Sequence, residues 1–143
     1  KKPRIINVPY NSYYYCYNPE SAVHSFRQDY ADRYISGMKK IKADLENADM
    51  MKNLQDEYDS CVLYHLLLIA VNFSFHPENP TAGKNRIKEF QMLIRQEIFK
   101  ESLKNVHPEN FSATRKVTLI CIQLHLYRIV QMIARIRHRQ RGR

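Results

Sequence analysis

The scarcity of glycine limits what this chain can form, because it has only three glycines in 143 residues. Tight β-hairpin turns use glycine for their positive φ angles. Phosphate-binding loops such as G-x-G-x-x-G need several glycines close together, and the sequence contains no such motif. Its 44% of hydrophobic residues can still bury a core in a chain of this length. We therefore expect a globular and mainly helical chain.

Helical periodicity begins near Ser25. Hydrophobic residues recur at spacings of three and four from Tyr30 to Leu45, which predicts a first helix. A second helix is predicted from about Met50 to Phe73. Its half from Cys61 to Val71 is apolar nearly all round, which favours a place at the centre of the fold. Thr81 is the predicted N-cap of a third helix, whose inner face comprises Ile87, Phe90, Leu93, Ile94, Ile98 and Leu103.

Two similar corners separate these helices. His76-Pro-Glu-Asn and His107-Pro-Glu-Asn each place Pro where a helix must stop and Asn where it assists a turn. Ser112 is the N-cap candidate of a last helix that runs to about His138. Residues 25–143 are therefore predicted to be a mainly α, four-helix antiparallel bundle with a basic tail.

A different pattern precedes the helices, in residues 1–24. Arg4 to Tyr10 is β-branched and suits a short strand, and Asn11 to Tyr17 is extended and aromatic in character. Side chains alternate faces on an extended segment, so one face would be open. Open tyrosines suit stacking on sugars or bases, whereas covered ones would pack between a sheet and the helices. The sequence leaves both alternatives open. The strand and the aromatic segment either pair with each other or belong to a sheet outside the chain, and we expect the second.

Residue chemistry indicates no catalytic machinery and no metal site within the chain. The triplet Glu57-Tyr58-Asp59 is interpreted as a solvated face, because helix residues two apart diverge by about 200°. The histidines show no spacing typical of zinc ligands, and His65 and His125 fit hydrogen-bonded core positions. Cys61 and Cys121 lie in apolar helices, so we expect both thiols to be inert.

Positive charge is concentrated at the C-terminal end. The net charge is +9, yet eight Lys and Arg follow Glu109 without any acidic residue, whereas residues 1–109 contain 15 basic and all 14 acidic residues. Ile129, Met132, Ile133 and Ile136 share one face of the last helix. A basic amphipathic helix favours an anionic membrane surface; a core helix with a frayed tail is the second interpretation, and nucleic-acid binding the third. The predicted contact residues are Arg128, Arg135, Arg137, Arg139 and Arg141.

The lead segment resembles a known enzyme family. It carries Ile5, Ile6, Val8 and Pro9, then Tyr13, Tyr14 and Tyr15, then Asn18, Ser21 and Ser25. This order is similar to the end of the catalytic domain in bacterial family 2 glycosyltransferases, which are inverting enzymes with a GT-A fold. The family often has Arg after the tyrosines, where this chain has Cys16. Residues 26–143 resemble the family's helical C-terminal extensions only in pattern.

The resemblance implies the C-terminal region of an enzyme of surface polysaccharide synthesis. Such an enzyme transfers a sugar from a nucleotide-sugar donor to a polysaccharide or lipid-linked acceptor, with Mn or Mg as its metal. The catalytic base and the Asp-x-Asp metal motif would lie upstream, so this piece alone is expected to be inactive and to hold no cofactor. The implied substrate-binding lip comprises Tyr13, Tyr14, Tyr15, Cys16 and Ser21.

The same resemblance gives the basic tail a role. It would hold the enzyme at the inner face of the cytoplasmic membrane, so we expect a cytoplasmic, peripheral protein. The alternative is a non-enzymatic helical module that binds an anionic membrane surface or nucleic acid through the Arg-rich last helix. Nucleic acid is the partner that the sequence favours least.

Overall fold

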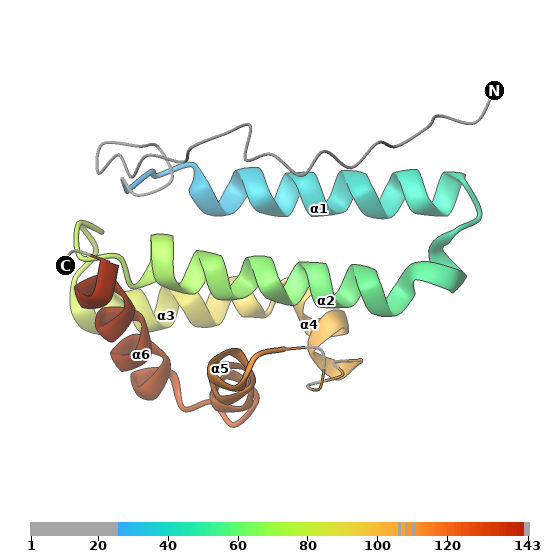
Figure 1. The fold of residues 1–143 in the computed structure, drawn as a ribbon. Coiled ribbons are helices and arrows are strands. Elements are labelled where there is room, and N and C mark those ends of the chain that lie inside the picture. The colour runs from blue at the N-terminus through green and yellow to red at the C-terminus, as the bar shows by residue number, and fades with distance from the viewer. Residues whose placement is uncertain (1–25, 106, 108, 110, 142–143) are drawn as a thin grey trace, which may run out of the picture.

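The computed structural model describes residues 26–105, 107, 109 and 111–141, and this part of the chain is mainly helical (Figure 1). No strand occurs among the described residues. The predicted strand and aromatic lead, residues 1–24, lie outside them. The helices are α1 (Tyr30–Asn47), α2 (Met51–Ile69) with its π-helical extension η1 (Ala70–Ser74), α3 (Gly83–Ile94), α4 (Glu97–Lys104), α5 (Ala113–Gln123) and α6 (Tyr127–Arg141).

Helix α2 lies at the centre of this arrangement. It runs antiparallel to α1, which covers one side, while α4 and α5 pack against it from other sides (Figure 1). Its extension η1 contacts α3 and α6. The apolar run of α2 is fully buried at Val62, Leu63, Leu66 and Ile69, which confirms the predicted central helix. Each such side chain contributes about 1.5–3 kcal/mol through removal from water.

The third predicted helix is divided into α3 and α4 by a turn at Arg95 and Gln96. Gln96 is extended, so α4 leaves the direction of α3 and packs against α2. Phe90 and Phe99, on either side of the turn, are both almost completely buried. The turn has no Gly or Pro, so the sequence carries no local signal for it. The predicted inner face is confirmed, since its other members are buried or packed on the core.

The last predicted helix is also divided in two, at His125. This residue has a φ of 58°, in the left-handed region that rarely suits a side chain. The His125 N–H donates to Ile122 O at 3.0 Å, and the Leu126 N–H donates to Cys121 O at 2.8 Å. This pair of hydrogen bonds is the Schellman pattern that ends helices, here without the usual glycine. The described chain thus has six α-helices where the periodicity predicts four.

The first His-Pro-Glu-Asn corner is confirmed as a helix stop. The Asn79 amide donates to Phe73 O at 3.0 Å and to Ser74 O at 3.1 Å, which satisfies carbonyls at the end of η1. Its side-chain oxygen accepts from the Thr81 N–H at 2.9 Å. Thr81 was the predicted N-cap, which is wrong, because Ala82 precedes α3 and the Thr81 hydroxyl donates to Glu89 instead. The second corner lies only partly within the described residues.

Ser112 holds the predicted N-cap position of α5, although its side chain makes no capping hydrogen bond. Within the described part of the chain, no helix combines the length and the apolarity that a bilayer crossing requires.

Candidate functional site

Helix α6 carries the predicted basic contact residues. Arg128, Arg135 and Arg139 are exposed, whereas Arg137 is half-buried and lines a small cavity beside η1. Arg141 is the last residue of the helix. The exposed three recur at spacings of seven and four, which aligns them along one side of the helix. The tyrosine lip, Tyr13, Tyr14, Tyr15, Cys16 and Ser21, lies outside the described residues.

The apolar face of α6 points away from the core. Tyr127, Val130 and Ala134 are buried, and α6 packs on η1 and α5. Ile129, Met132 and Ile136 remain 38–54% exposed, although they are the residues that the periodicity groups together. Ile133 is half-buried. Helix α6 thus has one side in the core and a second, apolar side that is open to solvent.

Helix α5 also carries exposed apolar side chains. Val117, Ile120 and Leu124 follow helical spacing and are 44–62% exposed, and Leu126 in the break between α5 and α6 is 43% exposed. Helices α5 and α6 pack against each other. We call these residues the apolar stripe: Val117, Ile120, Leu124, Leu126, Ile129, Met132 and Ile136.

A cationic cleft lies next to the stripe. It consists of two adjoining grooves that share His125 and Tyr127, one of about 530 Å³ bordered by α3, α4 and the end of α5, and one of about 450 Å³ between α3 and the start of α6. No Asp or Glu occurs among the described residues that line either groove. The basic side chains around them are Lys84, Lys88, Arg95, Lys100, Lys104 and Arg128.

Sequence reasoning missed this cleft except for Arg128. A signal was nevertheless available, because Lys84 and Lys88, and likewise Lys100 and Lys104, are four residues apart. Like charges at this spacing repel each other on one helix face and destabilise the helix slightly. The sequence does not show that the two pairs flank one cleft, since that depends on the turn at Arg95 and Gln96.

The Cys61 thiol does not form a nucleophile with the neighbouring histidine. Its Sγ lies 3.6 Å from His65 Nδ1, but the same nitrogen lies 2.7 Å from the Cys61 carbonyl oxygen. A carbonyl only accepts, so Nδ1 carries the proton and has no lone pair left for the thiol. Burial also raises the pKa of the Cys61 thiol. The expectation of an inert Cys61 agrees with this geometry.

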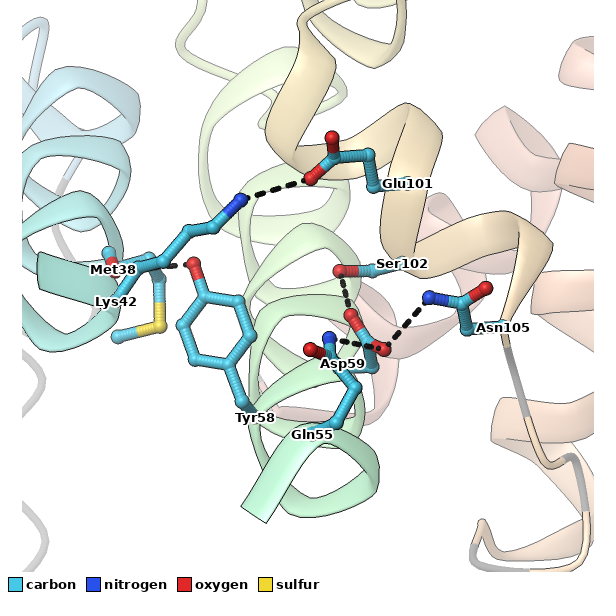
Figure 2. A network of polar contacts seen from close by, with 8 residues as sticks. All are labelled: Met38, Lys42, Gln55, Tyr58, Asp59, Glu101, Ser102 and Asn105. Atoms are coloured by element: carbon cyan, nitrogen blue, oxygen red, sulfur yellow. Dashed lines mark hydrogen bonds and ion pairs between the residues drawn. The ribbon is translucent and has the colours of Figure 1, made fainter. Parts of the chain in front are cut away.

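Asp59 differs from its predicted place on a solvated face. The side chain is buried, and its carboxylate accepts hydrogen bonds from Ser102, Asn105 and Gln55 (Figure 2). The interpretation of the triplet was wrong because two of these donors, Ser102 in α4 and Asn105 directly after it, lie more than forty residues further along the chain. In the described part of the chain, no three His, Cys, Asp or Glu side chains gather to hold a metal ion.

Comparison of the chain with known protein families, with curated proteins and with solved structures found no match.

Proposed function

We propose that this chain is a helical region that docks on an anionic membrane surface through α5 and α6. The observation that supports the proposal is the apolar stripe, which stays 38–62% exposed beside a line of exposed arginines. Surface-lying helices combine an apolar face, which enters the boundary between headgroups and acyl chains, with basic residues that reach the phosphates. Arg128, Arg135 and Arg139 lie where their long side chains can do so.

The expected affinity is moderate and reversible. Burial of apolar area contributes about 25 cal/mol per Å², and each basic residue near an anionic surface adds about 1 kcal/mol. The electrostatic part weakens with salt, because the Debye length falls to about 3 Å at 1 M ionic strength. Docking should therefore combine a salt-sensitive part from the arginines and a salt-resistant part from the stripe.

Flotation with liposomes tests the docking. We expect binding to vesicles that contain phosphatidylglycerol, and weaker binding to phosphatidylcholine vesicles or at high salt. The charge variant Arg128→Gln/Arg135→Gln/Arg139→Gln should lose most binding to anionic vesicles at low salt. The stripe variant Ile129→Ser/Met132→Ser/Ile136→Ser should lose binding at both salt concentrations.

Two variants control for general effects of charge and hydrophobicity. Arg33→Gln removes an exposed arginine of α1, and Met92→Ser removes an exposed apolar side chain of α3. Both should bind like the unmodified chain. Equal binding of the stripe variant and the Met92→Ser control would contradict docking through α5 and α6.

We further propose that this docking region belongs to a glycosyltransferase that uses a nucleotide-sugar donor and a polysaccharide or lipid-linked acceptor. The support is the resemblance of Arg4 to Ser25 to the end of a family 2 catalytic domain. A membrane-bound acceptor would explain why such an enzyme carries a docking surface. The Mn or Mg site would belong to the upstream part of the enzyme.

Sequencing the coding region upstream of Lys1 tests this second part. We expect a βαβ half followed by an Asp-x-Asp motif, and sugar transfer by the extended protein in the presence of Mn²⁺ or Mg²⁺. An upstream sequence without that motif would overturn the enzymatic proposal. The docking proposal would then stand alone as the non-enzymatic alternative.

A further inference from the structure

The six basic side chains of the cationic cleft lack carboxylate partners among the described residues. The ion pairs of the described chain involve Arg27, Arg33, Lys42 and His107, and none uses a cation of the cleft. All six cleft cations are exposed. Three like charges line each of the two adjoining grooves and repel each other, and a bound anion would relieve that repulsion.

The walls of the cleft indicate that its ligand is partly apolar. Ile94, Leu103 and Ile122 line the groove between α3, α4 and α5. Ile87, Leu126 and Ile129 line the adjoining groove, and the last two also belong to the apolar stripe. The cleft therefore opens onto the surface that we propose for membrane docking. A ligand with an anionic head and an aliphatic tail matches both features.

We propose that the cationic cleft binds the phosphomonoester headgroup of an anionic phospholipid such as phosphatidic acid. The phosphate lies among Arg95, Lys100 and Lys104, and the first acyl methylenes run along Leu126 and Ile129. A phosphomonoester carries about −1.5 to −2 charges at pH 7, which suits several cations better than a diester. The orientation of the bound lipid in the cleft rests on the proposed docking function, whereas the binding of its headgroup does not.

Nucleic acid suits this cleft less well. Single-stranded nucleic acid binds to basic grooves through aromatic side chains on which the bases stack. Tyr127 lines both grooves, but it is buried, and its hydroxyl lies 2.6 Å from His125 Nδ1. The other apolar lining residues are aliphatic, which favours acyl chains over bases.

Calorimetric titration with dioctanoyl phosphatidic acid, below its micelle concentration, tests the proposal without any membrane. The unmodified chain should bind this lipid at least about tenfold more tightly than dioctanoyl phosphatidylcholine or inorganic phosphate. The cleft variant Arg95→Gln/Lys100→Gln/Lys104→Gln should bind it at least about tenfold more weakly. The control Arg33→Gln/Lys39→Gln/Lys52→Gln removes three exposed charges far from the cleft in the sequence and should bind normally.

Three results would overturn the proposal: equal lipid binding by the cleft and control variants, equal binding of inorganic phosphate and the lipid, or tighter binding of a single-stranded oligonucleotide. Circular dichroism of each variant confirms that loss of binding is not loss of fold. The variant Met132→Ser/Ile136→Ser separates this proposal from membrane docking, because it changes the stripe outside the cleft. It should lose flotation with vesicles and keep its affinity for the soluble lipid.

Discussion

The Ser102 hydroxyl donates a hydrogen bond of 2.6 Å to the Asp59 carboxylate and thereby joins α4 to the central helix (Figure 2). The other carboxylate oxygen accepts from the Gln55 amide at 2.9 Å and from the Asn105 amide at 3.1 Å. Only 2% of Asp59 is exposed, so these three neutral donors replace the water that a carboxylate normally binds. The position of α4 therefore depends on a polar contact as well as on apolar packing.

Replacing this carboxylate should destabilise the fold strongly. In Asp59→Asn, one oxygen becomes an NH₂ group that faces donors instead of accepting from them. Leaving such buried donors unsatisfied costs about 1–3 kcal/mol. Urea denaturation at pH 7 measures the loss. Asp56→Asn is the matched control on the same helix, since Asp56 is exposed, and it should change stability by less than about 0.5 kcal/mol. Equal effects of the two substitutions would contradict a stabilising role for the network.

Tyr58 should make the fold sensitive to high pH. Its hydroxyl donates to Met38 O at 3.1 Å, and burial, with a smaller effect of Asp59, raises the pKa of Tyr58 to about 12. The unfolded chain loses this proton near the ordinary pKa of about 10, so the stabilisation is complete below pH 10. It is then lost as the pH rises from about 10 to 12, by about 2 kcal/mol in all.

The variant Tyr58→Phe isolates this effect. It should lose about 1 kcal/mol at pH 8, because the hydrogen bond to Met38 is gone. Between pH 10 and 12 its stability should fall less steeply than that of the unmodified chain. Urea denaturation at pH 8, 10 and 11 gives both values, and Tyr64→Phe serves as a control with a more exposed ring. Parallel pH profiles for Tyr58→Phe and the unmodified chain would rule out the raised pKa.

The periodicity predicts the central helix well, because the run from Cys61 to Val71 is apolar nearly all round and has almost no polar face that could point to water. The breaks at Gln96 and His125 could not be predicted in the same way. Neither has Pro or Gly nearby, and both depend on how later helices pack. Local sequence predicts helix formation here, whereas the direction of each helix depends on contacts that are distant in the sequence.

The candidate site is likewise predictable from the sequence where it lies on one helix, and not where several helices form it. The arginines and apolar face of α6 are found from one continuous helix, so spacing alone identifies them. The cationic cleft joins Lys84, Lys100 and Arg128, which belong to three different helices. Each of these residues resembles an ordinary solvated side chain in its own segment. Only the tertiary arrangement brings them together.

Lysine should not be able to replace Arg86, which holds the first corner, His76-Pro-Glu-Asn. Its guanidinium donates to the backbone carbonyls of Thr81, His76 and Asn79, with the first two bonds at 2.6 and 3.0 Å. A planar guanidinium can reach several carbonyls at fixed angles, whereas an ammonium group cannot. Arg86→Lys should therefore cost about 1–3 kcal/mol in urea denaturation.

The matched control for Arg86→Lys is Arg33→Lys, at a position where the side chain is 63% exposed. This control should change stability by less than about 0.5 kcal/mol. Hydrogen exchange should also show faster exchange of the Thr81 amide in Arg86→Lys, because that amide depends on the same corner. An unchanged exchange rate would show that Asn79 holds the corner without Arg86.

Replacing Asp49, at the end of α1, with glycine should stabilise the fold. It has a φ of 55°, and the Met50 N–H donates to Leu45 O at 2.9 Å in a second Schellman pattern. A left-handed conformation costs a residue with a side chain about 1–2 kcal/mol. Glycine avoids this strain, but it destabilises the fold by about 0.4–1 kcal/mol because it gives the unfolded chain more conformational entropy. The gain is therefore larger than the loss. Asp49→Gly should thus raise the free energy of unfolding by about 0.5–1 kcal/mol.

The neighbouring substitution Ala48→Gly should lower the free energy of unfolding instead of raising it. Ala48 has a φ of −87°, which any residue adopts, so glycine there brings only the entropic loss of about 0.4–1 kcal/mol. Thermal and urea denaturation of the two single variants should therefore shift in opposite directions. A destabilised Asp49→Gly would mean that the Asp49 side chain contributes more than its backbone strain costs.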